Sequence, residues 1–130
     1  MTKKEYVEYW RKAAEKDWIA VGHLFEKGDN LHALFFAHLV LEKLLKSHWV
    51  KDNLKDFPPK THNLPYLASQ TSVDLTQSQI EFLEKMNDFQ IDGRYPDFEL
   101  KMFEMCTDSF TQFVLDDVKI LMAWLQKHLY

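Results

Sequence analysis

The chain has 130 residues and a formal net charge of −4, with 46% hydrophobic and 28% charged residues. This balance is typical of a globular domain and excludes a disordered chain, while the acidic total argues against a surface for duplex nucleic acid. The single cysteine, Cys106, excludes an internal disulfide and any multi-cysteine zinc site. We expect one domain spanning residues 1–130, with no cofactor.

The N-terminal sequence MTKKEYVEYW lacks the apolar core of a signal peptide. No run of the sequence approaches the roughly 20 apolar residues that a membrane span requires. One lone cysteine also fits a reducing compartment. We therefore expect a cytoplasmic protein without a membrane segment.

Apolar residues recur at helical spacing through most of the chain, and only three glycines and four prolines interrupt it. Because the connections are short, neighbouring helices should pack antiparallel. We expect an all-α fold, an up-and-down four-helix bundle with one additional short helix. The long helices should cover about 4–27, 31–50, 76–91 and the segment from 107 or 108 onward, the short helix should follow His62-Asn63, and the segment 97–107 is ambiguous. The inner stripe of the last helix should consist of Phe110, Phe113, Val114, Val118, Leu121, Trp124 and Leu125.

The second long helix, 31–50, is apolar nearly all round, which is typical of a central helix. One polar row runs along it, because His38, Glu42 and Lys46 are spaced by four residues and so share a face. In the first helix, Asp17 interrupts an apolar stripe in the same way. Such residues either satisfy one another or line a ligand groove, and the sequence leaves both interpretations open.

The stretch GRYPDF, residues 93–98, should end the helix before it. Gly93 tolerates the left-handed conformation of a helix end, and Pro96 disfavours helical backbone at Tyr95. Arg94 then lies at a helix C-terminus, whose partial negative charge favours a cation. It could bind a substrate there, or reach Asp17 or Glu42 as a buried plug that closes the bundle.

Four segments, in this order, resemble the HEPN domain family: AEKDWIAVGHLFE, HALFFAHLVLEKLLKSHW, PPKTHNLPYLA and GRYPD. The resemblance covers about residues 5–127. It implies an all-α bundle that is often dimeric and is often encoded beside, or fused to, a nucleotidyltransferase domain. We therefore expect a homodimer and a nucleotidyltransferase partner.

In the family, several short motifs are associated with a proposed nucleotide or ligand groove. They are an acidic residue in the first helix, EK..K in the second, H.L after it and Arg-Tyr-Pro near the end. His38 departs mildly from the family, because glutamine is frequent at that place. The resemblance thus implies a nucleotide or phosphate-bearing ligand in contact with Asp17, His38, Glu42, Lys43, Lys46, His62, Arg94 and Tyr95.

The ribonuclease members of the family resemble one another in an arginine followed four to six residues later by a histidine, a pair suited to RNA cleavage. Here Arg11 is followed by KAAEKDW and Arg94 by YPDFELK, so neither has such a histidine. We therefore expect a non-catalytic HEPN-like binding module. Two alternatives stay open, namely an RNA-cleaving or partner-dependent, toxin-type enzyme that uses another histidine, and a purely structural dimerisation domain.

Other chemistries have weaker signals. No histidine has a glutamate three residues before it, so the di-metal motif of helical bundles is missing, and His38 with Glu42 is only a two-ligand pair that His62 might join. Cys106 lies near a helix start, where a thiol can be activated, although a core role is commoner. A phosphate-attracting patch or a solvated face could be formed by Lys43, Lys46, Lys51, Lys55 and Lys60.

Overall fold

The computed structural model describes all 130 residues, and every regular element in it is helical, which confirms the predicted all-α class. None of the helices combines the length and the apolar character that a bilayer crossing requires. In chain order the elements are α1 (Lys3–Glu26), α2 (Asn30–Asp52), α3 (Leu64–Ser69), α4 (Gln77–Met86), the 3-10 helix η1 (Asn87–Phe89), α5 (Pro96–Met105) and α6 (Asp108–Lys127).

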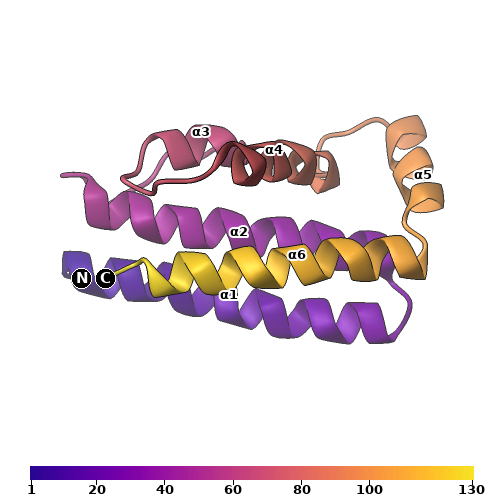
Figure 1. The fold of residues 1–130 in the computed structure, drawn as a ribbon, viewed down its shortest axis with the longest axis horizontal. Coiled ribbons are helices and arrows are strands. Elements are labelled where there is room, and N and C mark those ends of the chain that lie inside the picture. Colours follow the sequence, from indigo (N-terminus) through magenta and orange to yellow (C-terminus); the bar gives the residue numbers. More distant parts are fainter.

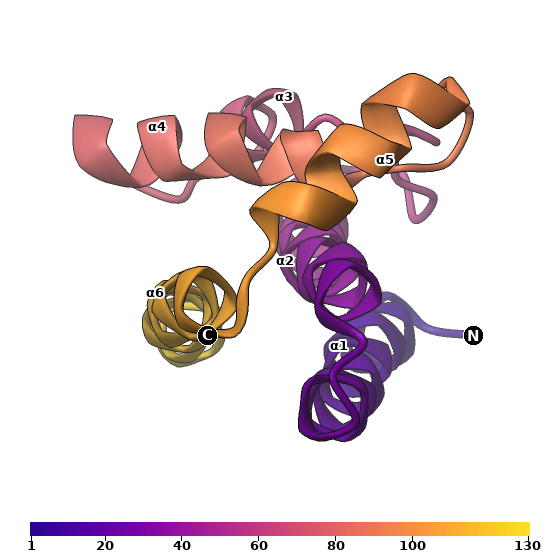
Figure 2. The ribbon, with the colours of Figure 1, turned by 90° about the vertical axis from the view of Figure 1, so that its right-hand side faces the viewer.

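Helix α2 is the centre of the bundle. Helix α1 runs antiparallel along it, α6 lies beside both, and α3 and α4 cover the opposite side of α2 (Figure 1). Seen along the long axis, α1, α2 and α6 are end-on, whereas α4 lies obliquely across them (Figure 2). The predicted bundle with an additional short helix is therefore present, and the structure adds α5 between η1 and α6.

Local signals set the ends of the helices. The side chains of Thr2, Thr76 and Thr107 cap α1, α4 and α6, each accepting a hydrogen bond from a backbone N–H of the first turn. Gly28, after α1, and Gly93, after η1, have φ angles of 80° and 76°, which side chains with a Cβ rarely adopt. The positive φ angle of Gly93 agrees with the helix end that the sequence predicts there.

Two segments differ from what the sequence predicts. The helix expected over 76–91 ends at Met86 and tightens into η1, which turns Met86 and Phe89 into the core. The ambiguous segment 97–107 is mostly helix α5. It begins at Pro96, because proline suits the first position of a helix, where its missing N–H leaves no hydrogen bond unmade.

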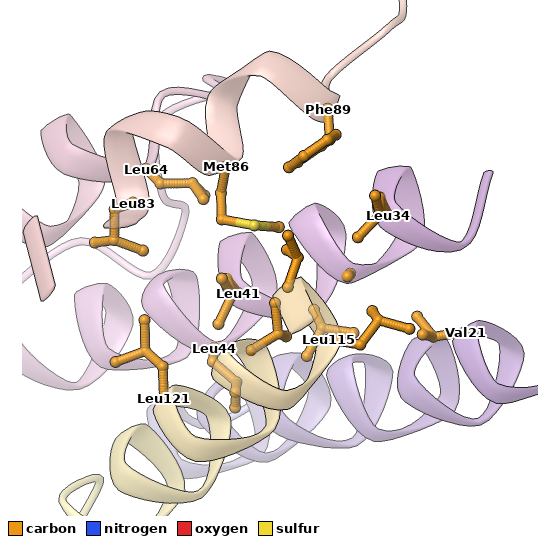
Figure 3. Close-up of a cluster of buried hydrophobic side chains, with 14 of the residues drawn as sticks. Val21, Leu34, Leu41, Leu44, Leu64, Leu83, Met86, Phe89, Leu115 and Leu121 are labelled. Atoms are coloured by element: carbon orange, nitrogen blue, oxygen red, sulfur yellow. The ribbon is translucent and has the colours of Figure 1, made fainter. Parts of the chain in front are cut away.

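The main hydrophobic core surrounds α2. Its leucines meet side chains from α1, α3, α4 and α6, and Met86 and Phe89 lie over the outer face of α2 (Figure 3). On α6 the core-facing residues include Val114 and Leu115. Phe113, predicted to lie on this inner stripe, is instead 68% exposed, so that prediction is wrong.

Candidate functional site

The polar row of α2 gathers around one buried carboxylate. Glu42 is only 4% exposed. Its Oε1 accepts a hydrogen bond from His62 Nδ1 at 2.7 Å, and its Oε2 accepts one from Lys46 Nζ at 3.1 Å. Both bonds are needed, because a buried carboxylate without partners is very costly. We call His38, Glu42, Lys46 and His62 the Glu42 cluster.

His38 holds the backbone of His62. The ring of His38 is fully buried, and its Nε2 lies 3.0 Å from the carbonyl oxygen of His62. Because a carbonyl can only accept, Nε2 carries the hydrogen. Burial lowers the pKa of His38 and outweighs the opposite effect of Glu42, whose Oε1 lies 3.8 Å from Nδ1. His38 therefore acts as a neutral donor to the loop.

His62 is the exposed member of the cluster, with 55% of its side chain accessible. Glu42 fixes its ring through Nδ1, and His38 fixes its carbonyl group. The next residue, Asn63, caps α3 by accepting a hydrogen bond from the backbone N–H of Tyr66, as the sequence predicts. Two residues on one face of α2 thus clamp a single histidine, and its Nε2 is left without a hydrogen bond inside the chain.

A second ion pair lies on the seam between α1 and α2. Lys43 Nζ is 2.6 Å from Asp17 Oδ2, and both side chains keep some exposure, 25% and 15%. Nearby on the same seam, Lys46 Nζ lies 5.4 Å from the centre of the Trp10 ring, within the range of a cation–π contact. Since an ammonium group has three donors, each lysine retains hydrogens beyond the one directed at its carboxylate.

Arg94 and Tyr95 are not in contact with the Glu42 cluster. Arg94 is exposed, its Nε donates to the carbonyl of Gln90 at 3.2 Å, and its guanidinium group lies 4.5 Å from the centre of the Phe98 ring. Gln90 is the C-cap residue of η1, so Arg94 lies beyond η1 and not directly at the end of α4. The buried-plug hypothesis is wrong, because both carboxylates proposed as partners bind lysines instead. Tyr95 is 80% exposed.

The lysines that the sequence grouped together are largely neutralised. Lys51 pairs with Asp52 at 2.5 Å, in addition to the pairs already described for Lys43 and Lys46. Lys55 and Lys60 alone among the five make no ion pair within the chain. Any attraction for phosphate at this end of the molecule must therefore come from local hydrogen bonds rather than from a broad positive field.

An aromatic hollow beside the cluster was not predicted. It measures about 320 Å³, and its walls include Tyr6, Tyr9, Trp10 and Phe57. Trp10 joins it to the cluster, because the same ring contacts Lys46. Tyr9 and Trp10 lie three and four residues after Tyr6, so each of them is a neighbour of Tyr6 on the surface of α1. The contribution of Phe57 could not be anticipated, because it depends on the path of the loop after α2.

Two further candidate chemistries receive no support. No group of three histidine, cysteine or carboxylate side chains is placed to hold a metal ion, so His38, Glu42 and His62 do not form the three-ligand set considered above. Burial raises the pKa of the Cys106 thiol to about 11. A thiol with that pKa is protonated at neutral pH, so Cys106 is a core residue and not an activated nucleophile.

The fold and this polar cluster define an all-α helical-bundle domain with one clamped, exposed histidine. The sequence model of the HEPN domain family matches residues 7–129. The chain therefore belongs to the HEPN domain family, and the predicted resemblance is confirmed. No curated protein and no solved structure matches the chain.

Proposed function

We propose that the chain is a HEPN-type binding module that holds a phosphate-bearing ligand, in particular a nucleotide, at the Glu42 cluster. The observation that carries this proposal is the exposed imidazole of His62, fixed at 2.7 Å from a buried carboxylate. A side chain that is already held in one orientation loses little conformational entropy when a ligand binds it. Its unused Nε2 is therefore a preorganised contact.

The chemistry of the cluster suits a small anion. When His62 carries a proton on both nitrogens, Nδ1 donates to Glu42 while Nε2 donates to a phosphate oxygen. Lys46 and Lys43 can add donors from the same seam. Because Glu42 and Asp17 neutralise these lysines, directional hydrogen bonds rather than net charge select the ligand. This favours a single nucleotide over a long polyanion.

The aromatic hollow offers a place for the base. Tyr9 and Phe57 are 57% and 73% exposed, and stacking of a base on such rings contributes roughly 1–3 kcal/mol in other proteins. The family resemblance implies a ligand contact at Tyr95, but Tyr95 lies on a turn that does not contact the cluster. A nucleotide with its phosphate at His62 and its base against Tyr9 and Phe57 would use both features.

The family resemblance adds a protein partner to the proposal. Because HEPN domains are often encoded beside nucleotidyltransferase domains, we propose that such an enzyme acts together with this module. The nucleotide would then be common to the two proteins. A neighbouring nucleotidyltransferase gene would support this part of the proposal independently of any binding measurement.

Thermal unfolding against a panel of nucleotides, with and without magnesium, tests the binding proposal. A ligand at a hundred times its Kd adds about 2.7 kcal/mol of stability, which raises the Tm of a domain of this size by roughly 10 °C. His62→Asn keeps an N–H donor for Glu42 and removes Nε2, so it should fold and lose the shift. His128→Asn, at an exposed histidine outside the cluster, is the matched control and should keep it. A shift that survives in His62→Asn contradicts the proposal.

A second candidate function follows from the same pair. If His62 is neutral and donates Nδ1–H to Glu42, its Nε2 carries a lone pair and can take a proton, and the carboxylate stabilises the imidazolium that results. This geometry supports the alternative of an RNA-cleaving enzyme, although the arginine–histidine motif is missing. Cleavage of RNA by the wild type and by His128→Asn, but not by His62→Asn, would establish it. An inactive wild type would exclude it for the isolated chain.

A further inference from the structure

A long groove runs between α4 and α6. Two hollows of about 450 and 310 Å³ share four lining residues, Phe82, Lys85, Phe113 and Asp117, and so form one continuous depression. Viewed along the bundle, α4 and α6 lie to the same side of α2 (Figure 2). We call this depression the α4–α6 groove. No residue of the Glu42 cluster lines it, so it is separate from the proposed ligand site.

The groove exposes large apolar side chains. Phe113 and Ile120, both on α6, are 68% and 70% exposed. Phe110 and Phe89, the last residue of η1, line the smaller hollow. Apolar groups that lie next to one another in a hollow, rather than scattered singly over a surface, mark interaction sites. The groove therefore offers apolar surface that a partner could remove from water.

The dimensions of the groove fit a helix. Its lining residues on α6 run from Phe110 to Leu121, which at 1.5 Å per residue is about 16 Å, or three helical turns. An extended peptide gains most of its affinity by pairing with a sheet edge, and this fold has no strand. An amphipathic helix has already satisfied its own backbone, so it needs only an apolar groove.

The charges that line the groove indicate which kind of helix it would bind. Glu81 lines only the larger hollow and Asp88 only the smaller one, so a carboxylate lies toward each end, and Asp117 lines both. Lys85 is the single positive lining residue. A second copy of the groove would bring carboxylates against carboxylates and concave surface against concave surface. A helix with lysine or arginine beside its apolar stripe complements both features.

We propose that the α4–α6 groove is a docking site for an amphipathic helix of a partner protein. The helix presents about three turns, with apolar residues at the i, i+3 or i+4, and i+7 positions and basic residues on both flanks. Its apolar side chains cover Phe113 and Ile120, and its basic residues pair with Glu81, Asp88 and Asp117.

Fluorescence anisotropy with two labelled helical peptides tests this proposal. One peptide carries leucines at the spacing above and lysines on the flanks, and the other has glutamates in place of the lysines. We expect the wild type to bind the lysine peptide at least about tenfold more tightly than the glutamate peptide, and the preference to weaken with salt. The double substitution Glu81→Lys and Asp117→Lys should reverse the preference.

A matched pair of variants separates the groove from general surface effects. Ile120→Asp lies in the groove, whereas Ile19→Asp makes the same change at a 60% exposed position of α1 outside it. We expect Ile120→Asp to lose about tenfold or more in affinity and Ile19→Asp to bind as the wild type does. Phe113→Asp provides a second groove variant if circular dichroism shows that Ile120→Asp is unfolded.

Three results of the peptide experiment would overturn the proposal: equal affinity for the two peptides, equal loss of affinity in the two isoleucine variants, or no binding of the lysine peptide. The proposal would also be overturned by a wild-type dimer that Ile120→Asp converts to a monomer, because the groove would then hold a second copy of this chain.

Discussion

Glu42 illustrates how one buried charge can be satisfied by residues from different parts of the chain. Lys46 lies one turn along the same helix, whereas His62 lies 20 positions later in a loop. The ion pair with Lys46 follows directly from helical spacing, but the bond to His62 ties the loop to α2. Glu42 therefore links the stability of the bundle to the orientation of the proposed ligand contact.

At this scale the structure excludes one of the two roles considered for Arg94, the buried plug. Its guanidinium group is exposed and contacts only a backbone carbonyl and the Phe98 ring, so we expect Arg94→Ala to lower the free energy of unfolding by less than about 1 kcal/mol. A buried ion pair would instead cost about 3–5 kcal/mol when broken. Urea unfolding of the variant distinguishes these values, and a loss in the upper range would restore the plug hypothesis.

The row on α2 and the loop that follows it form one unit at the scale of the elements. The helical period places His38, Glu42 and Lys46 on one face, and this could be predicted from the sequence alone. The sequence could not show that His62 rather than Arg94 would reach that face. The outcome depends on the path of residues 53–63, which is held by long-range contacts such as the 2.8 Å ion pair of Lys3 with Asp56 and the 3.3 Å bond from Asn87 Nδ2 to Asn63 Oδ1.

The buried histidines of α2 should make stability depend on pH. Burial lowers the pKa of both His38 and His48, so the unfolded chain binds these protons more readily than the folded chain does. The contribution of these two neutral histidines to the free energy of unfolding is therefore fully present above about pH 6.5, the ordinary pKa of histidine, and decreases as the pH falls below that value. His38→Gln can keep a donor for the His62 carbonyl but cannot titrate.

We therefore expect a smaller loss of stability in His38→Gln than in the wild type when the pH is lowered from about 7.5 to about 5. Urea midpoints at several pH values measure this difference. The remaining pH dependence should reflect His48, whose Nε2 lies 2.8 Å from the carbonyl oxygen of Leu125. Identical pH profiles for the two proteins would show that His38 does not titrate as described.

For the molecule as a whole, the sequence predicts the helices better than it predicts their arrangement. The all-round apolar character of α2 indicates its central position, because a helix that is apolar on every face must be covered by other elements on several sides. The oblique course of α4 has no such local signal. It follows from Met86 and Phe89 packing over α2 after the helix tightens into η1, which is a tertiary contact.

Local sequence patterns also fail to show which apolar residues of the helices are exposed at the surface. Helical spacing predicts a core position for Phe113, because this periodicity does not distinguish a buried stripe from an apolar groove that opens beside it. The structure thus separates two faces of the bundle, the Glu42 cluster with its aromatic hollow and the α4–α6 groove. A ligand and a partner protein could therefore bind at the same time.

The central claim is that His62 contacts the ligand while Glu42 holds its ring. Heteronuclear NMR of the histidine side-chain nitrogens during titration with ATP tests it most directly. We predict that the Nε2 resonance of His62 moves, that its Nδ1–H stays hydrogen-bonded to Glu42, and that the resonances of buried His38 change little. Unchanged His62 resonances together with a shift of the Arg94 guanidinium signals would place the ligand at the Arg-Tyr-Pro turn and contradict the claim.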